Sequence, residues 1–546
     1  MASAFTAAAR LGAQYSTPAL AMVAVTSSCA ATTSSSTTTS AAVTNCESAS
    51  SPRQSSPKKS PPPHPNYRKR MTQVGRFSLL SETATNPSIP VMVLSLTGKP
   101  WTPQDFLQLY FDRKIPKKHD RFRAVLDPND LRHFLTKPDT PPKVEEAMSY
   151  PVVYRAELKD WIADATVQPL SLSESLWQAR TATGGAIGQS GAIGKIQAER
   201  IRKERPEDAV ESLLLFRAHH CMADGVSLGA IFGDFMDEGE EFQALIAQKV
   251  KEYKKKKKSW WKRLQMLVLY WWWGSIRAFS YQIYLYLQTW VTSDPWKLLQ
   301  AHVEGTFTQP RNLSWVQIAS VSEVKEVAEY FSQHTRGKVT VNDIFCSCVS
   351  AAIAKLLKFH KASYPDLNLS LPLMNLVIPV HMQGGILLPG QPMGNKIGAM
   401  VNRIPAEAAT DPENRLQRVH DVLWNRKQTP AAVWSFLAAK LFGGIGSRLG
   451  GLTPWLFQKA HANASVVVTN VRGPETHLHL GGRRVETTLG FLPLPPGIPI
   501  GMVVYSYANG ITLSVTAEPW AVPDADLFLS WVAEEYQALK QLSRES

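Results

Sequence analysis

Hydrophobic and polar residues form short blocks along most of the chain, and the spacing of the apolar positions predicts strands and helices of ordinary length. Strands are predicted where apolar or β-branched residues run together, at 89–96, 125–126, 213–216, 371–380, 465–470, 502–507 and 511–516. Helices are predicted at 103–111, 226–232, 321–332, 341–359, 411–424 and 525–542. An Asn509-Gly510 turn joins the last two strands into a hairpin. Strands and helices therefore alternate irregularly along the chain.

The N-terminal 75 residues lack this pattern. They are rich in Ala, Ser and Thr, contain no acidic residue before Glu47, and end in a proline-rich, basic linker. Such a segment buries too little apolar surface to fold, so we expect 1–75 to be a disordered tail. The same composition is typical of an organelle transit peptide, and a weak secretory signal is the third interpretation.

A second exception is the stretch 264–291, which is apolar and aromatic throughout and has Arg277 as its only charge. Five lysines at 254–258 precede it. Lysines attract an anionic leaflet, and Trp and Tyr suit the headgroup region. We expect a helix or helical hairpin embedded in one leaflet, since Arg277 would oppose a full span. A membrane span and a buried helix between lobes are the alternatives.

This stretch divides the folded chain into 76–250, a membrane-associating linker at 251–305, and 306–546. The 546 residues carry a formal net charge of +14, and 44% of them are hydrophobic. Much of the charge lies in the tail and the lysine run, so nucleic-acid binding is not inferred. The five cysteines form neither an even disulfide set nor a zinc pattern, which indicates reduced thiols in a cytosol-facing protein and no metal.

The candidate chemistry lies in His219-His220-Cys221-Met222-Ala223-Asp224-Gly225, between a predicted strand and a predicted helix. A neutral histidine can take a proton from a hydroxyl and return it later. Neighbouring residues at a strand end point in opposite directions, so one histidine faces a cleft and the scaffold holds the other. Gly225 is expected where a Cβ would clash. A pair of purely structural histidines, and a Cys221–His220 nucleophile, are weaker alternatives.

This H-H-x-x-x-D-G pattern resembles the motif of CoA-dependent acyltransferases of the chloramphenicol acetyltransferase type. From about Arg76 onward, the chain is similar to the bifunctional wax ester synthase/diacylglycerol acyltransferase family. Five blocks carry the resemblance: 219–225, 169–177, Asn342-Asp343, Gly394-Asn395, and 469–474 with the hairpin and the Val522-Pro523-Asp524 that follow it. Ser171, Ser175 and Arg472 depart from the family pattern, which bears on substrate preference.

The resemblance implies an α/β fold of two lobes, 76–250 and 306–546, each a mixed sheet flanked by helices, that meet around a tunnel. His220 would be the general base, supported by His219, Asp224 and Gly225. Asp224 would pair with Arg121 or Arg123 or cap its helix. The remaining implied site residues are Asn342 as an oxyanion donor or helix cap, Asp343 as a structural residue, and Trp177, Asn395 and Asn470 at the substrate channel.

The implied function is transfer of a long-chain acyl group from acyl-CoA to a fatty alcohol or diacylglycerol, without an acyl-enzyme, metal or other cofactor. Membrane lipids would be partners and nucleic acid would not. The expected location is the endoplasmic reticulum membrane with a cytosolic active site, or a plastid if the tail is a transit peptide. A non-catalytic, membrane-associated lipid-binding protein with the same fold is the alternative.

Overall fold

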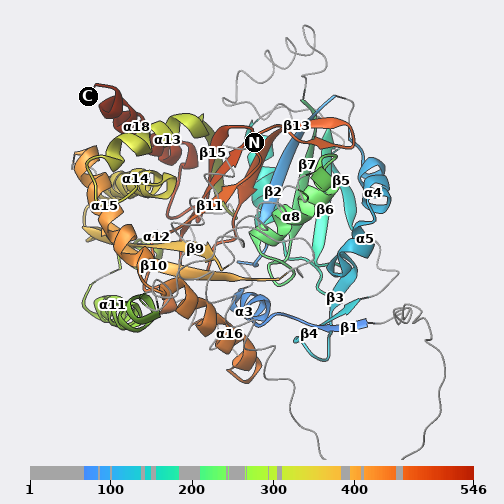
Figure 1. The fold of residues 1–546 in the computed structure, drawn as a ribbon, viewed down its shortest axis with the longest axis horizontal. Coiled ribbons are helices and arrows are strands. Elements are labelled where there is room, and N and C mark those ends of the chain that lie inside the picture. The colour runs from blue at the N-terminus through green and yellow to red at the C-terminus, as the bar shows by residue number, and fades with distance from the viewer. Residues whose placement is uncertain are drawn as a thin grey trace, which may run out of the picture.

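The computed structural model describes residues 67–83, 86–98, 101–136, 142–148, 155–183, 210–241, 244, 265, 267–292, 294–303, 310–382, 394–407, 411–449, 455 and 459–545. The lysine run 254–258 and most of the predicted tail therefore lie outside the described residues. Within this part of the chain, the molecule consists of two six-stranded mixed sheets, one small three-stranded sheet, and helices packed on them (Figure 1). The predicted α/β class is confirmed.

The predicted tail extends too far toward the C-terminus. Residues 67–75 are folded, since Tyr67–Arg70 forms β1 and Gln73–Ser81 forms α3. β1 pairs antiparallel with β4 (His133–Thr136), and Arg68 forms an ion pair with Asp127 at 3.0 Å. Arg68 and Lys69, two of the basic residues that suggested a linker, are thus paired with acids of the folded lobe. Composition alone could not show this, because the acids lie some sixty residues further along the chain.

The N-terminal sheet has the strand order β12-β13-β2-β7-β6-β5. Its strands are β12 (His479–Leu480), β13 (Arg483–Phe491), β2 (Val91–Thr97), β7 (Val210–Ala218), β6 (Trp177–Thr183) and β5 (Val144–Met148). β5 and β6 are parallel and the other neighbours are antiparallel. Around it lie α4 (Pro103–Asp112), α5 (Ile115–Lys118), η1 (Asp120–Arg123), α6 (Arg155–Val167) and α8 (Gly225–Phe235), and β3 (Ala124–Leu126) pairs with β4.

The C-terminal sheet has the order β10-β9-β11-β14-β15-β8. Its strands are β10 (Ile397–Pro405), β9 (Leu373–His381), β11 (Val466–Arg472), β14 (Ile500–Tyr507), β15 (Gly510–Ala517) and β8 (Asn312–Ser320). The helices of this lobe are α12 (Pro295–Val303), α13 (Val321–Ser332), α14 (Val341–Ser363), α15 (Pro412–Lys427), α16 (Ala431–Leu449) and α18 (Ala525–Glu545). The periodicity located α13, α14, α15 and α18 to within a few residues.

The division into consecutive lobes needs one correction. β13 lies within the predicted C-terminal segment 306–546, but it pairs with β2 of the N-terminal sheet, with Phe491 opposite Val91. In Figure 1 the red β13 lies beside the blue β2, so residues far apart in sequence share one sheet. β13 has the same alternation of apolar and polar residues as a strand of the C-terminal sheet. The sequence pattern therefore does not show that it pairs with β2 of the N-terminal sheet.

The lobes are also joined by a shared apolar core. Trp315 of β8 packs in one buried cluster with Val93, Leu215 and Phe491 of the N-terminal sheet. The interior of each lobe is a separate cluster, built around α14 in the C-terminal lobe and around aromatic side chains in the N-terminal lobe. Part of the lobe boundary is therefore a packed hydrophobic interface.

The aromatic stretch forms a π-helical segment, η3 (Leu267–Trp273), continued by the helix α11 (Gly274–Val291). None of the helices that the structure describes is long and apolar enough to cross a bilayer. α11 buries one side, with Ala278 and Leu285, against the C-terminal lobe. In Figure 1 it lies at the outer side of that lobe, next to α15 and α16.

Candidate active site

The motif forms the turn between β7 and α8, as predicted. Two backbone bonds fix the histidines there: the N–H of His219 donates to the Leu176 carbonyl and that of His220 to the Ser88 carbonyl, both at 2.7 Å. The turn is therefore attached to two separate segments of the N-terminal lobe before any side chain contributes.

His219 is held by the scaffold through both ring nitrogens. Its Nδ1 accepts the N–H of Cys221 at 3.0 Å, so the proton is on Nε2, which donates to the Glu82 carboxylate at 3.0 Å. The same Glu82 oxygen accepts the N–H of Ser88. Because His219 is buried and both nitrogens are occupied, it supports the loop and has no nitrogen left for substrate.

His220 has one occupied nitrogen and one without a partner among the described residues. The Asn395 amide spans the loop: its Nδ2 donates to the His220 carbonyl and its Oδ1 lies 3.2 Å from His220 Nδ1. A carbonyl can only accept, so this fixes which end of the amide faces the ring. Nδ1 therefore carries the proton, and Nε2 presents a lone pair.

The surroundings of His220 favour the neutral ring. Burial lowers the pKa of His220 below its ordinary value of 6.5 and outweighs the opposing field of Asp224. At neutral pH the imidazole is consequently unprotonated on Nε2. This is the protonation state that a general base requires.

Asp224 is fully buried and joins the two lobes. Its Oδ1 accepts the N–H of Ser227 at 2.7 Å and caps α8, while Oδ2 accepts the N–H of Lys396 at 2.8 Å. His381 Nε2 lies 3.5 Å from Oδ2. Burial opposes the charge, yet His381 and the two N–H groups hold the pKa of Asp224 below its ordinary value.

The predicted arginine partner of Asp224 is not the one the structure shows. Arg121 instead donates to the carbonyl of Met222, inside the motif. A carbonyl and a carboxylate both attract a guanidinium, and the sequence could not distinguish them. Arg121 still supports the loop, through its backbone.

A glycine is required close to the catalytic loop, but it is Gly75 and not the predicted Gly225. Gly225 opens α8 with nothing within 4 Å of a built Cβ, so the expected clash is wrong. At Gly75 of α3, a Cβ would lie 2.7 Å from the carbonyl oxygen of Cys221. The close approach that requires glycine is thus on the helix that packs against the loop.

Asn342 and Asn470 come together in the C-terminal lobe, where Asn470 Nδ2 donates to Asn342 Oδ1 at 2.7 Å. Asn342 lies in the first turn of α14 and Asn470 on β11. Asn342 did not become the helix cap, because Thr340 occupies that position. An oxyanion role for Asn342 stays a prediction.

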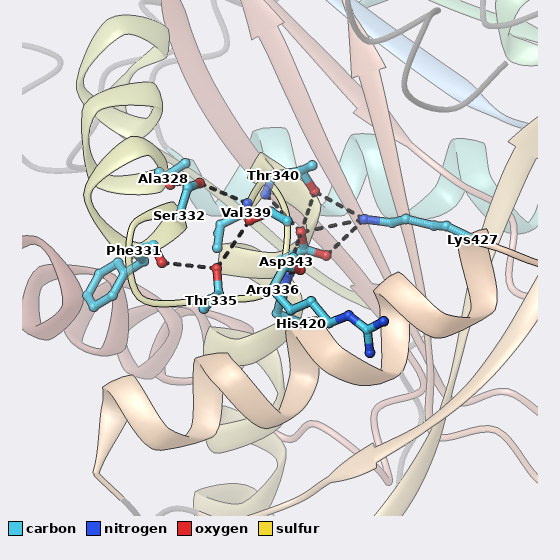
Figure 2. A network of polar contacts seen from close by, with 11 residues as sticks. Ala328, Phe331, Ser332, Thr335, Arg336, Val339, Thr340, Asp343, His420 and Lys427 are labelled. Carbon is cyan, nitrogen blue, oxygen red and sulfur yellow. Dashed lines mark hydrogen bonds and ion pairs between the residues drawn. The ribbon is translucent and has the colours of Figure 1, made fainter. Parts of the chain in front are cut away.

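Asp343 belongs to a buried polar network (Figure 2). The N–H and the hydroxyl of Thr340, the N-cap of α14, both donate to Asp343 Oδ2 at 2.8 Å. Lys427 Nζ lies 3.0 Å from Oδ1, and His420 Nδ1 lies 3.1 Å from Oδ2. His420 Nε2 faces the Arg336 carbonyl at 3.0 Å. Every partner is within the C-terminal lobe, which agrees with the structural role expected of Asp343.

Trp177 is a core residue in the structure. Its side chain is fully buried among Phe122, Phe216 and Tyr110, and its indole N–H donates to the Phe122 carbonyl at 2.9 Å. The prediction that Trp177 lines the substrate channel is therefore wrong. Asn395, also predicted at the channel, is a hydrogen-bonding partner of His220.

The residues that sequence reasoning missed are Glu82, His381 and Gly75. Each contacts the motif from more than 130 positions away in the chain, as the pairs His219–Glu82 and Asp224–His381 show. No local pattern marks such residues. Within the described part of the chain, no group of three His, Cys, Asp or Glu side chains is placed to hold a metal ion.

Comparisons with known proteins show which family this chain is similar to. Residues 393–540 match the family model of the WS/DGAT C-terminal domain. Wax ester synthase/diacylglycerol acyltransferase 11 of Arabidopsis thaliana is 22% identical over 456 residues, which is 77% of this chain and 85% of that protein. A probable diacylglycerol O-acyltransferase of Mycobacterium tuberculosis is 20% identical over 373 residues, 64% of this chain and 75% of that protein.

A solved structure gives the same fold. The wax ester synthase/diacylglycerol acyltransferase from Marinobacter aquaeolei VT8 superposes with a TM-score of 0.52 at 14% identity, covering 87% of this chain and 100% of that one. The predicted family resemblance and the predicted two-lobed acyltransferase fold are confirmed by these matches.

Proposed function

We propose that this relative of the wax ester synthase/diacylglycerol acyltransferases transfers a long-chain acyl group from acyl-CoA to the hydroxyl of a fatty alcohol or of diacylglycerol. The observation that carries the proposal is His220, whose Nδ1–H is bonded to Asn395 and whose Nε2 has no partner among the described residues. The intact motif and the family match supply the reaction class: acyl transfer to oxygen.

The site supports direct transfer between two substrates bound together. Nε2 of His220 takes the proton of the acceptor hydroxyl as its oxygen bonds to the thioester carbon. The tetrahedral intermediate then expels the CoA thiolate, which receives the same proton from Nε2. One histidine thus serves as base and then as acid, with no metal and no acyl-enzyme.

Cys221 is poorly placed to be a nucleophile. It is fully buried in the N-terminal core, and its backbone N–H supports the ring of His219. The acceptor hydroxyl is therefore the attacking group in this proposal. Initial rates should show lines that intersect when both substrates are varied, whereas parallel lines would indicate a covalent intermediate.

The remaining parts of the proposal concern location. Long-chain alcohols and diacylglycerol reside in bilayers, so membrane lipids are proposed as partners, with the protein on the endoplasmic reticulum and its site facing the cytosol. A plastid location follows instead if the first 66 residues are a transit peptide. Fractionation of cells that express the full chain with a C-terminal tag distinguishes the two.

Replacement of His220 by Ala tests the function. Turnover of palmitoyl-CoA with hexadecanol, and separately with dioleoylglycerol, should fall by roughly 10²–10⁴-fold, which is what a positioned base contributes. His219→Gln is the matched control, since it keeps a hydrogen-bonding side chain on the neighbouring residue and should lose activity mainly through stability.

Thermal melting of both variants separates chemistry from folding. A folded His220→Ala protein with near-normal ester formation would contradict the mechanism. An inactive wild-type protein that still binds acyl-CoA would favour the alternative, a lipid-binding protein with a retained fold.

A further inference from the structure

An exposed apolar surface extends over two helices at the outer side of the C-terminal lobe. On η3 and α11 the exposed side chains include Trp272 (74% exposed) and Trp290 (73%). The others on this surface are Leu269, Ile276, Phe279, Ile283 and Leu287 of η3 and α11, and Leu437, Leu441 and Ile445 of α16. These residues together are the surface discussed below.

The exposed positions follow helical spacing on each element. On α11, Ile276, Phe279, Ile283 and Leu287 recur every three or four residues, opposite the buried Ala278 and Leu285. α11 is therefore apolar on both sides, although only one side packs on protein. The exposed residues of α16 are four apart and make one matching stripe.

Trp434 joins the two helices into one surface. Its indole N–H donates to Ser275 at 3.0 Å, and its ring packs against Phe279 with 5.1 Å between centroids. Gly274 approaches Pro430 so closely that a Cβ would meet its ring at 3.0 Å. Figure 1 shows α11 and α16 along the same side of the molecule.

The charge of the residues in and around α11 and α16 indicates which partner binds this surface. Neither 253–293 nor 422–474 contains a single Asp or Glu, while the first range includes the lysines at 254–258. A twofold dimer through α11 and α16 would bring together two helix pairs that carry Arg277 and Lys440 and no acidic side chain, so the surface is not complementary to itself. Aromatic and apolar side chains on helices that carry only positive charge are instead complementary to an anionic bilayer.

α16 also connects this surface to the catalytic loop. A Cβ on Gly443 would lie 1.8 Å from the Gln73 carbonyl of α3, and Arg76 of α3 donates to the Gly444 carbonyl at 3.2 Å. α3 in turn approaches the loop at Gly75. On its other side α16 meets β10, where Ser435 Oγ accepts the N–H of Ala399.

We propose that α11 and α16 together dock the protein onto one leaflet of an anionic membrane, which places the lipid surface one helix away from His220. This inference rests on the proposed function for its purpose, because the acceptor lipid enters from that leaflet. Docking itself does not depend on catalysis and is measured separately. The sequence analysis predicts no helix at 431–449, so the part of this surface on α16 is known from the structure alone.

Vesicle flotation of the full chain tests the proposal. Wild-type protein should bind vesicles of phosphatidylcholine with phosphatidylserine, and more weakly those of phosphatidylcholine alone. Ile283→Glu/Leu287→Glu on α11 and Leu437→Glu/Leu441→Glu on α16 should each weaken partition at least about tenfold, the usual scale for losing burial of one large apolar side chain. Phe111→Glu/Leu131→Glu is the matched control, because it charges exposed apolar residues outside this surface.

The outcomes are distinct. Unchanged binding in both double variants would overturn the proposal, and a loss only in the α11 variant would overturn the part assigned to α16. A wild-type dimer that both variants disrupt, with vesicle binding intact, would show self-association instead. With water-soluble short-chain substrates all folded variants should keep wild-type turnover; a chain that binds vesicles but is inactive on every substrate would refute the proposed function and leave docking standing.

Discussion

His220 of the N-terminal lobe and His420 of the C-terminal lobe are both near a buried aspartate, yet they are bonded in opposite ways. His420 presents Nδ1 to Asp343 and Nε2 to the Arg336 carbonyl, and both of these groups only accept. His420 therefore carries both protons. His220 has one nitrogen bonded and the other without a described partner, so it is neutral and can accept a proton.

The two aspartates differ in the same sense. Burial opposes ionisation of Asp343, but Lys427 and His420 keep its pKa below the ordinary value. All of its partners belong to one lobe. Asp224 has the backbone of Lys396 and the ring of His381 as partners, both from the opposite lobe. Asp343 therefore stabilises one lobe, whereas Asp224 holds the two lobes in register.

The largest effect on stability is expected from Asp343→Ala. It leaves the nearly buried Lys427 and the buried His420 without their anion, and breaking a buried pair of this kind costs about 3–5 kcal/mol. The midpoint of urea unfolding should fall accordingly. Turnover per folded molecule should change little, and a loss of activity at unchanged stability would contradict the comparison.

Asp224→Asn should have a smaller effect on stability and a clear effect on rate. The amide still caps α8 through its oxygen but turns an N–H₂ toward the N–H of Lys396. The displaced loop moves Nε2 of His220, and misplacement by about 1 Å costs roughly 100-fold. The kcat should fall by up to this factor while the melting temperature stays close to that of wild type; Asp343→Asn is the control, and equal kcat losses in the two would remove the distinction.

The smallest effect is in the pH dependence of stability. Burial opposes the charged ring of His420, but its bonds to Asp343 and Arg336 prevail and raise its pKa above 6.5. This contribution is fully present below pH 6.5 and is lost as pH rises through the raised value. Thermal melting of the wild type should show this alkaline decline, and His420→Asn should lack it. Identical profiles would mean that His420 is neutral.

The pH dependence of catalysis tests the predicted neutral state of His220. Since burial lowers the pKa of His220 in the free protein, the acid limb of kcat/KM should lie below pH 6.5. An acid limb of kcat/KM above pH 6.5 would show that burial does not lower the pKa of this ring. The two histidines would then differ less than their hydrogen bonds indicate.

The sequence predicted the parts of this molecule that depend on neighbours in the chain. The helix at 321–332 and the turn at the motif follow from local spacing, and both are present in the structure. The partners of the motif do not. Asn395 reaches His220 across 175 positions, and Glu82 reaches His219 across 137. Such contacts depend on how the lobes meet, which no window of sequence contains.

The aromatic stretch shows the same limit. Its composition predicted a lipid-facing helix, and α11 is a helix with one face exposed. α16 was not predicted from the sequence, and its exposed Leu437, Leu441 and Ile445 are recognised only in the structure. Whether an apolar stripe faces protein or solvent is decided by the elements packed beside it.

The exchange of β13 has a consequence for how the protein is made. Until a ribosome has added Phe491, β2 lacks its neighbour and remains an open edge with unpaired backbone groups. Sequence separation of this size makes a pairing slow, and open edges invite association with other chains. The N-terminal sheet therefore stays incomplete while most of the C-terminal lobe is synthesised. A chain released before residue 491 should depend on chaperones to avoid aggregation.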